Sequence, residues 1–273
     1  MKKRLQEFAL NLRKAVLKID KRQRFIIATA TIFVANFLLT LLPFSVAVFF
    51  LPVLLVVVYA ATYFALLEGI EQIEWFVLFI MPLYFTASML LFYYLLPSRL
   101  LAKVPYMLVS SVITYAILLS ENIFNVGVEK SLPLYRAAFS VANFVSLVVL
   151  FLIFTVLFSF RLNFLFNTFF GGLLAWPVFF HGIWSSSPRA VLEERVYKFA
   201  TILSFLLSFA ICILNFVPIK TSIYSLYTVA NAYVLLGITQ EIIQNTVFKE
   251  RIREYLVVFG VMSLLVILTA IWN

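Results

Sequence analysis

The chain has 273 residues, of which 64% are hydrophobic and only 12% charged, and its mean hydropathy is +1.07. An average soluble domain is roughly 45–50% apolar and about 25% charged. The composition therefore excludes a water-soluble globular protein and predicts an all-α, polytopic integral membrane protein. At about 20 apolar residues for each crossing of a hydrocarbon layer of ~30 Å, the chain has room for eight or nine transmembrane helices.

The formal net charge of +9 is concentrated at the start of the chain. Residues 1–24 contain nine of the 21 lysines and arginines and two acidic residues, Glu7 and Asp20, which leaves a net charge of only +2 for the remainder. Apolar residues recur in this segment with the 3.6-residue period of a helix, at Leu5, Phe8, Leu12, Val16 and Ile19. We expect a basic amphipathic helix that lies on the cytoplasmic surface of the membrane and contacts anionic lipid headgroups, and we expect no binding of nucleic acid.

Nine apolar segments follow, which we predict to be the transmembrane helices of one domain over residues 25–273. They are residues 25–42, 46–67, 75–96, 104–124, 135–160, 163–184, 196–216, 221–243 and 255–272. The first two form an apolar run of 43 residues, which is too long for one crossing. Because Pro43 has no backbone N–H and disfavours a helix before it, we expect a tight turn over residues 41–45. A re-entrant hairpin is the alternative.

The distribution of basic residues predicts the orientation of these segments. With a cytoplasmic N-terminus, 17 of the 21 lysines and arginines lie on the cytoplasmic side. If the first hairpin were re-entrant, every later loop would change sides and only 13 would lie there. Because cytoplasmic loops are enriched in Lys and Arg, we expect nine spans in the plasma (cytoplasmic) membrane, with the N-terminus in the cytoplasm and the C-terminus outside.

A few polar residues near the cytoplasmic ends of the segments predict a candidate site. Glu121 and Glu241 end the fourth and eighth segments, and His181 lies near the cytoplasmic end of the sixth. Asn143 lies deeper in the fifth segment, and Arg136 begins it. Ionisable groups within a membrane are costly and often functional. The leading hypothesis is a transporter-like or permease-like protein in which these five residues bind a small solute, ion or proton in a polar cavity open to the cytoplasm.

Two other functions stay open. A membrane enzyme acting on a lipid or lipid-linked substrate would use Glu121 as a general base and Arg136 to hold a phosphate. A scaffold or assembly subunit would use its polar residues for packing and anchoring, with an exposed packing stripe at Gly171–Gly172. The sequence contains no H-E-x-x-H, G-x-S-x-G or nucleotide-binding loop motif. We therefore predict no catalytic residue, no cofactor and no metal ligand.

Overall fold

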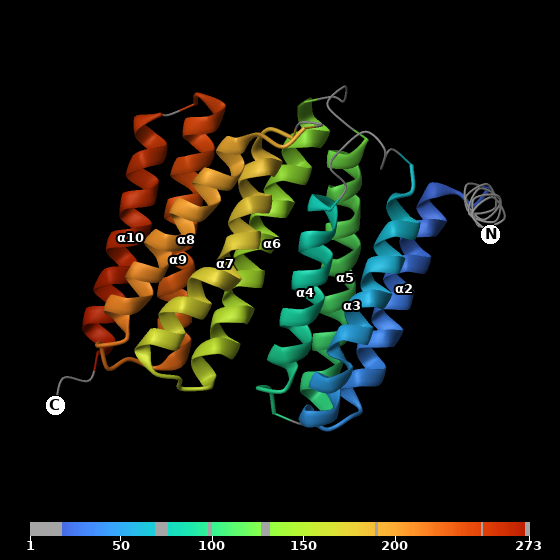
Figure 1. Ribbon diagram of the computed structural model, residues 1–273, viewed down its shortest axis with the longest axis horizontal. Helices are drawn as coiled ribbons and strands as arrows, with labels where there is room; N and C mark the ends of the chain where they lie inside the picture. The colour runs from blue at the N-terminus through green and yellow to red at the C-terminus, as the bar shows by residue number, and fades with distance from the viewer. Residues whose placement is uncertain are drawn as a thin grey trace. The chain divides into compact units, whose positions relative to one another are not determined.

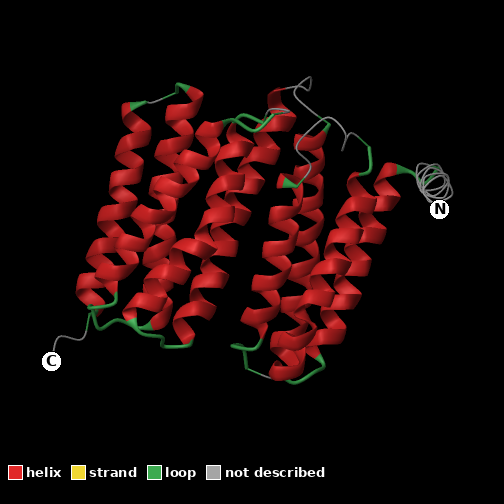
Figure 2. Ribbon diagram, in the orientation of Figure 1, coloured by secondary structure: helices red, strands yellow, loops and turns green. Residues whose placement is uncertain are grey.

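The computed structural model describes residues 18–68, 76–97, 100–126, 132–188, 191–246 and 248–270. These residues form α-helices joined by short loops, and no strand occurs among them (Figures 1 and 2). The helices are α2 (Lys21–Thr40), α3 (Phe44–Leu66), α4 (Val77–Tyr93), α5 (Leu100–Asn125), α6 (Leu132–Ser159), α7 (Phe164–Ser186), α8 (Glu194–Leu214), α9 (Thr221–Gln244) and α10 (Lys249–Thr269).

Eight of these helices are long and apolar enough to cross a membrane. The exception is α4, which has 17 residues and is about 25 Å long at a rise of ~1.5 Å per residue. That length is at the lower limit of what a transmembrane helix needs. The prediction of a polytopic helical membrane bundle is confirmed in the described residues.

The chain divides into two compact units, residues 1–138 and 139–273, and α6 begins in the first unit and continues in the second. In the first unit, α3 packs against α2, α4 and α5, and α2 also packs against α5. Figure 1 shows these four helices side by side. Their core contains the fully buried side chains of Leu66, Leu78, Phe85 and Leu118. The single transmembrane domain expected over residues 25–273 stays a prediction.

The predicted turn between the first two apolar segments is present as a helical hairpin. Helix α2 ends at Thr40, and Pro43 precedes α3 with a φ of −65°, which suits the proline ring. The hydroxyl of Tyr94 closes the turn by donating to the carbonyl oxygens of Leu39 at 2.8 Å and Leu42 at 3.0 Å. Both helices of the hairpin qualify as candidate membrane spans, which favours a spanning hairpin over a re-entrant one.

The first helix begins earlier than the sequence predicts. Helix α2 starts at Lys21, so the boundary expected between residues 24 and 25 falls inside its first turn. Most of the expected amphipathic helix, residues 1–17, lies outside the described residues. Arg24, expected at the membrane surface with the basic tail, is instead completely buried.

In the second unit, α7 and α8 form the most extensive helix pair, and α9 packs against α7, α8 and α10. Gly171 and Gly172 lie in the α7–α8 interface, where an added Cβ atom would meet the side chains of Ile211 and Ser208. The glycine pair is therefore covered by α8 of the same chain, and the exposed packing stripe expected there is not present. Within α10 only Tyr255 and Val266 are buried.

Candidate functional site

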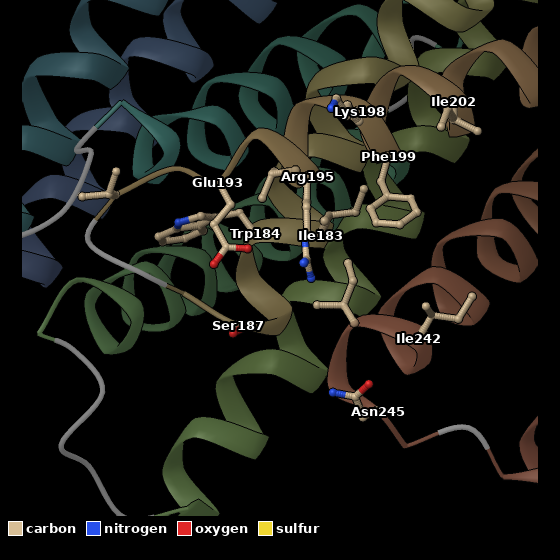
Figure 3. Close-up of a pocket in the computed structure, with 13 residues that line it drawn as sticks. Ile183, Trp184, Ser187, Glu193, Arg195, Lys198, Phe199, Ile202, Ile242 and Asn245 are labelled. Carbon is tan, nitrogen blue, oxygen red and sulfur yellow. The ribbon is translucent and has the colours of Figure 1, made fainter.

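A pocket of about 420 Å³ lies in the second unit, where α7 and α9 end and α8 begins (Figure 3). Its lining comes from these three helix ends and from the α7–α8 connection: Ile183, Trp184, Ser187, Val191, Glu193, Arg195, Val196, Lys198, Phe199, Ile202, Ile242, Ile243 and Asn245. The volume falls in the range of small-molecule sites, roughly 300–1,000 Å³. We refer to it below as the α7–α9 pocket.

Local backbone features bring these helix ends together. Helix α7 stops at Ser186, and Ser187 leaves the helical conformation with a φ of −151°. Helix α9 ends at Gln244, and the next residue, Asn245, has a left-handed φ of 53°, which asparagine tolerates better than most residues. Glu193 is extended and precedes α8. The α7–α8 connection and the end of α9 leave a space between the three helix ends.

Charged side chains occupy one part of the pocket. Figure 3 shows Glu193 and Arg195 projecting into it from the start of α8. Lys198, one turn further along α8, forms an ion pair with Glu194 at 2.9 Å. This pair is at the surface, since the two side chains are 64% and 80% exposed. The charged residues that line the pocket are therefore Glu193, Arg195 and Lys198, and Lys198 is paired with Glu194 of the same helix.

Much of the pocket lining is apolar. Phe199 and Ile202 of α8 contribute to it, as do Ile242 and Ile243 of α9. Ile202 and Ile242 are 51% and 50% exposed, so this part opens on the outer surface of the helices. A ligand that matches both parts must be amphiphilic, with a polar end and an apolar end.

A buried polar network lies next to the pocket. The Gln240 amide on α9 donates to Asn143 Oδ1 on α6 at 2.9 Å and to the Gly182 carbonyl on α7 at 2.8 Å. His181 is fully buried, and its ring lies 6.0 Å from that of Trp184. Trp184 also lines the pocket and therefore connects His181 with it. Two of the predicted site residues, Asn143 and His181, thus lie close to each other and near the pocket.

Glu241 directly precedes the two isoleucines of the pocket. Its carboxylate lies 3.7 Å from Arg251 Nε, and the Glu241 side chain is only 14% exposed. The second oxygen, Oε2, is buried and has no hydrogen-bond partner in the described part of the chain. Glu241 is therefore a shielded carboxylate between α9 and α10, and it does not line the pocket itself.

The other two predicted residues belong to the first unit. Glu121 on α5 is 1% exposed, whereas Arg136 near the start of α6 is exposed. The rings of Phe124 and Tyr135, 6.0 Å apart, bring the two helix ends together. Glu121 and Arg136 nevertheless have different surroundings, one in the protein interior and one at its surface. The cavity expected to join Glu121 with Glu241 stays a prediction.

A charged cluster in the first unit was missed from the sequence. The buried Arg24 guanidinium donates to Glu68, which also lies 3.4 Å from Lys21 Nζ. Asn125 at the end of α5 donates to the carbonyl oxygen of Glu68 at 2.7 Å. Asp20 was the signal in the sequence for a helix that begins at residue 21, because aspartate is a common residue directly before a helix. A helix beginning at residue 21 would have placed Arg24 inside the first span.

No group of three or more His, Cys, Asp or Glu residues that could hold a metal ion occurs within the described ranges. Comparison with protein-family models, with curated proteins and with solved structures finds no match for this chain. Its site is therefore interpreted from the geometry above.

Proposed function

We propose that this multi-pass membrane protein is a transporter-like protein that binds an amphiphilic small molecule or lipid in the α7–α9 pocket. The observation that carries the proposal is that one pocket is lined by both charged and apolar side chains. Glu193 and Arg195 supply the first, and Phe199, Ile242 and Ile243 the second. Ligand sites commonly combine apolar walls with a few placed polar groups.

The position of the pocket supports entry of the ligand from the membrane. Ile202 and Ile242 are half exposed on the outer surface of two helices that qualify as membrane spans. Lipid chains would surround such a surface, whereas the charged part lies at the helix ends. An amphiphile in a bilayer has the same arrangement, with its tail in the hydrocarbon and its headgroup at the interface.

Buried polar groups beside the pocket support movement of a ligand over passive binding. His181 and Glu241 are shielded within candidate spans and adjoin pocket residues. Ionisable residues within membrane spans commonly mark substrate and proton pathways. We assign His181 and Glu241 to this role. Asn143 supports the pocket through Gln240, and Glu121 is the corresponding shielded carboxylate of the first unit.

Binding is tested by thermal unfolding of the purified protein with a short-chain amphiphile. The variant Ile202→Trp fills the apolar part of the pocket, and Ile213→Trp is its control because Ile213, on the same helix, is 55% exposed outside the pocket. A ligand that binds the native state raises the unfolding temperature by mass action. We expect this rise in the wild type and in Ile213→Trp and its loss in Ile202→Trp. An equal response in all three proteins would contradict the proposal.

Transport is tested separately in proteoliposomes. A fluorescent amphiphile present in both leaflets is exposed to a membrane-impermeant quencher, and movement between leaflets makes the protected fraction accessible. We expect the wild type and Ile213→Trp to accelerate this movement and Ile202→Trp to lose the acceleration. Binding without any acceleration would overturn the transport function and leave a binding function.

A further inference from the structure

We infer that the first unit contains an oxyanion site at Arg24, where the carboxylate of Glu68 is an internal ligand that a phosphate group can replace. The site lies at one end of this unit, where α2 begins and where α3 and α5 end. None of its residues lines the α7–α9 pocket. The inference therefore does not depend on the proposed function.

The guanidinium of Arg24 has more hydrogen-bond donors than the described residues satisfy. The side chain is completely buried, and its Nη2 donates to Glu68. Its Nε and Nη1 atoms are also buried and have no hydrogen-bond partner in the described part of the chain. Buried polar groups in native proteins are nearly always hydrogen-bonded. Two unsatisfied donors on a buried cation therefore point to an additional acceptor.

The charges at this site are unequal as well. Lys21 Nζ lies 3.4 Å from Glu68, and Arg24 contacts the other oxygen of the same carboxylate. Within the described ranges, neither cation forms a further ion pair. Asp20 and Arg22 beside them are exposed and have opposite charges. One carboxylate thus compensates two cations, whereas a phosphate offers more negative charge and more acceptor oxygens.

Glu68 is the partner that can leave this site. Its side chain is 44% exposed, whereas the Arg24 side chain is 0% exposed. A carboxylate that is already half exposed can turn into water at little cost, but a buried guanidinium left without an anion is strongly unfavourable. Arg24 therefore requires an anion at all times, and a second anion can take the place of Glu68.

The backbone at Glu68 is held independently of its side chain. The amide of Asn125, at the end of α5, donates to the carbonyl oxygens of Leu66 at 3.0 Å and of Glu68 at 2.7 Å. Asn125 is itself completely buried. Rotation of the Glu68 side chain toward water therefore leaves the contact between α3 and α5 in place. The rotation vacates the position of a carboxylate beside Arg24.

The two cations specify an oxyanion of the phosphate type. A guanidinium presents planar, parallel N–H donors that match two oxygens of one phosphate, and an ammonium group adds a point charge. A halide ion is a single centre and does not match several separate donors in this way. The phosphate can belong to a free compound or to a lipid headgroup, because the site lies at the ends of α2, α3 and α5, which qualify as membrane spans.

Binding is measured by thermal unfolding of the whole chain in a neutral detergent, with inorganic phosphate replacing chloride at constant ionic strength. A ligand that binds the native state raises the unfolding temperature by mass action. We expect a small rise in the wild type, because phosphate must displace Glu68, and a larger rise in Glu68→Gln. Removal of the competing carboxylate should lower the Kd for phosphate about tenfold or more, since the buried Arg24 then lacks its anion.

Control variants separate this site from general effects of charge. Glu194→Gln removes a carboxylate as Glu68→Gln does, but from a surface ion pair, and should respond as the wild type does. The double variant Arg24→Gln, Glu68→Gln leaves neither charge buried alone and should lose the response to phosphate. Lys21→Gln changes a partly exposed side chain and keeps the buried pair. It should weaken phosphate binding, whereas Lys198→Gln should not.

A second titration identifies the source of the phosphate. In an Ile202→Trp background, where the α7–α9 pocket is filled, Glu68→Gln is titrated with a short-chain phosphatidic acid and with diacylglycerol of equal chain length. A lower Kd for phosphatidic acid than for inorganic phosphate would identify a lipid headgroup, and equal values would identify a free phosphate compound. Either result supports the oxyanion site, provided that diacylglycerol does not bind.

Two results would overturn the site. One is an equal response to phosphate in the wild type, Glu68→Gln and the double variant. The other is a response of Glu68→Gln to added chloride as large as its response to phosphate, which would show screening of charge instead of binding. Both results concern residues of the first unit, and both leave the proposed function intact.

Discussion

The side chain of Gln240 joins to that of Asn143 by hydrogen bonds in both directions, at 2.9 and 3.3 Å between nitrogen and oxygen. Gln240 also donates to the carbonyl oxygen of Gly182 at 2.8 Å. One amide thereby connects α9 with α6 and α7. Asn143, expected from the sequence to line a polar cavity, is thus part of a bridge between helices that lies next to the pocket.

Replacement of Gln240 by leucine should destabilise the second unit. The substitution leaves the polar groups of Asn143 and Gly182 without these partners in an apolar interior. We expect the free energy of unfolding to fall by about 1–2 kcal/mol, measured by reversible unfolding in mixed micelles. Asn231→Leu is the control and should have a smaller effect, because Asn231 donates within its own helix, to Tyr227 at 2.8 Å.

The coupling between the two amides is measured with a double-mutant cycle. Asn143→Leu and Gln240→Leu each break the pair, and the double variant removes both polar groups. We expect the double variant to be more stable than the sum of the two single effects implies, by about 0.6 kcal/mol or more. Strict additivity would contradict a direct interaction between these side chains in the membrane protein.

The close approach of α7 and α8 should make Gly172 intolerant of a larger residue. An added Cβ would collide with Ser208 Oγ and would lie 3.1 Å from the carbonyl oxygen of Ser204. We expect Gly172→Ala to lower the free energy of unfolding by about 1–3 kcal/mol, as overpacking commonly does. Thermal unfolding of the purified protein provides the measurement.

Two further variants test this explanation. Gly260→Ala should be neutral or stabilising, because no atom lies within 4 Å of the added Cβ and alanine is the better helix former. Adding Ser208→Gly to Gly172→Ala removes the hydroxyl that causes the collision and should recover part of the lost stability. A Gly172→Ala protein as stable as Gly260→Ala would show that the two helices do not pack this closely.

Hydropathy predicts the helices of this protein well because the apolar length of a span is a local property of the sequence. The turn at Pro43 was predicted for the same reason, since proline limits the helix within a few residues. Arg24 was assigned to the tail because its charge implies exposure, whereas Glu68, 44 residues away, compensates that charge in the folded chain. A long-range partner of this kind is not visible in local hydropathy.

The pocket was not predicted because its lining depends on how helix ends meet. Arg195 counted in the sequence only as one of the basic residues that set orientation, and Ile242 only as part of a span. Their common pocket arises from the packing of α7, α8 and α9. The same limit applies to Gly171 and Gly172. The two glycines indicate close helix packing, but the sequence alone does not identify α8 as the helix that packs there.

The predicted orientation is tested at the two ends of α9. In a Cys212→Ser background, which removes the single cysteine, Lys220→Cys and Lys249→Cys each place an exposed thiol at one end of this helix. A membrane-impermeant maleimide added to intact cells should label position 220 and not position 249. Labelling of position 249 alone would reverse the orientation, and labelling of both would contradict α9 as a membrane span.

Acidification should weaken the first unit through Glu68. Partial burial raises the pKa of its carboxyl, but the charges and hydrogen bonds of Arg24 and Lys21 outweigh that effect and hold the pKa below its usual value of 4.5. A carboxyl whose pKa is depressed by folding stabilises the native state above its unfolded pKa, and this contribution is lost as the pH falls through the folded value. We therefore expect the stabilisation by Glu68 to decline below about pH 4.5.

The substitution Glu68→Gln separates this effect from general acid denaturation. The variant should be less stable than the wild type at neutral pH, because the buried Arg24 loses its charged partner. Its stability should fall less steeply below pH 4.5 than that of the wild type, since the ionisation has been removed. Glu194→Gln is the control, because Glu194 is 80% exposed and surface ion pairs contribute little. Parallel pH profiles for the wild type and Glu68→Gln would mean that the Arg24–Glu68 pair does not contribute to stability.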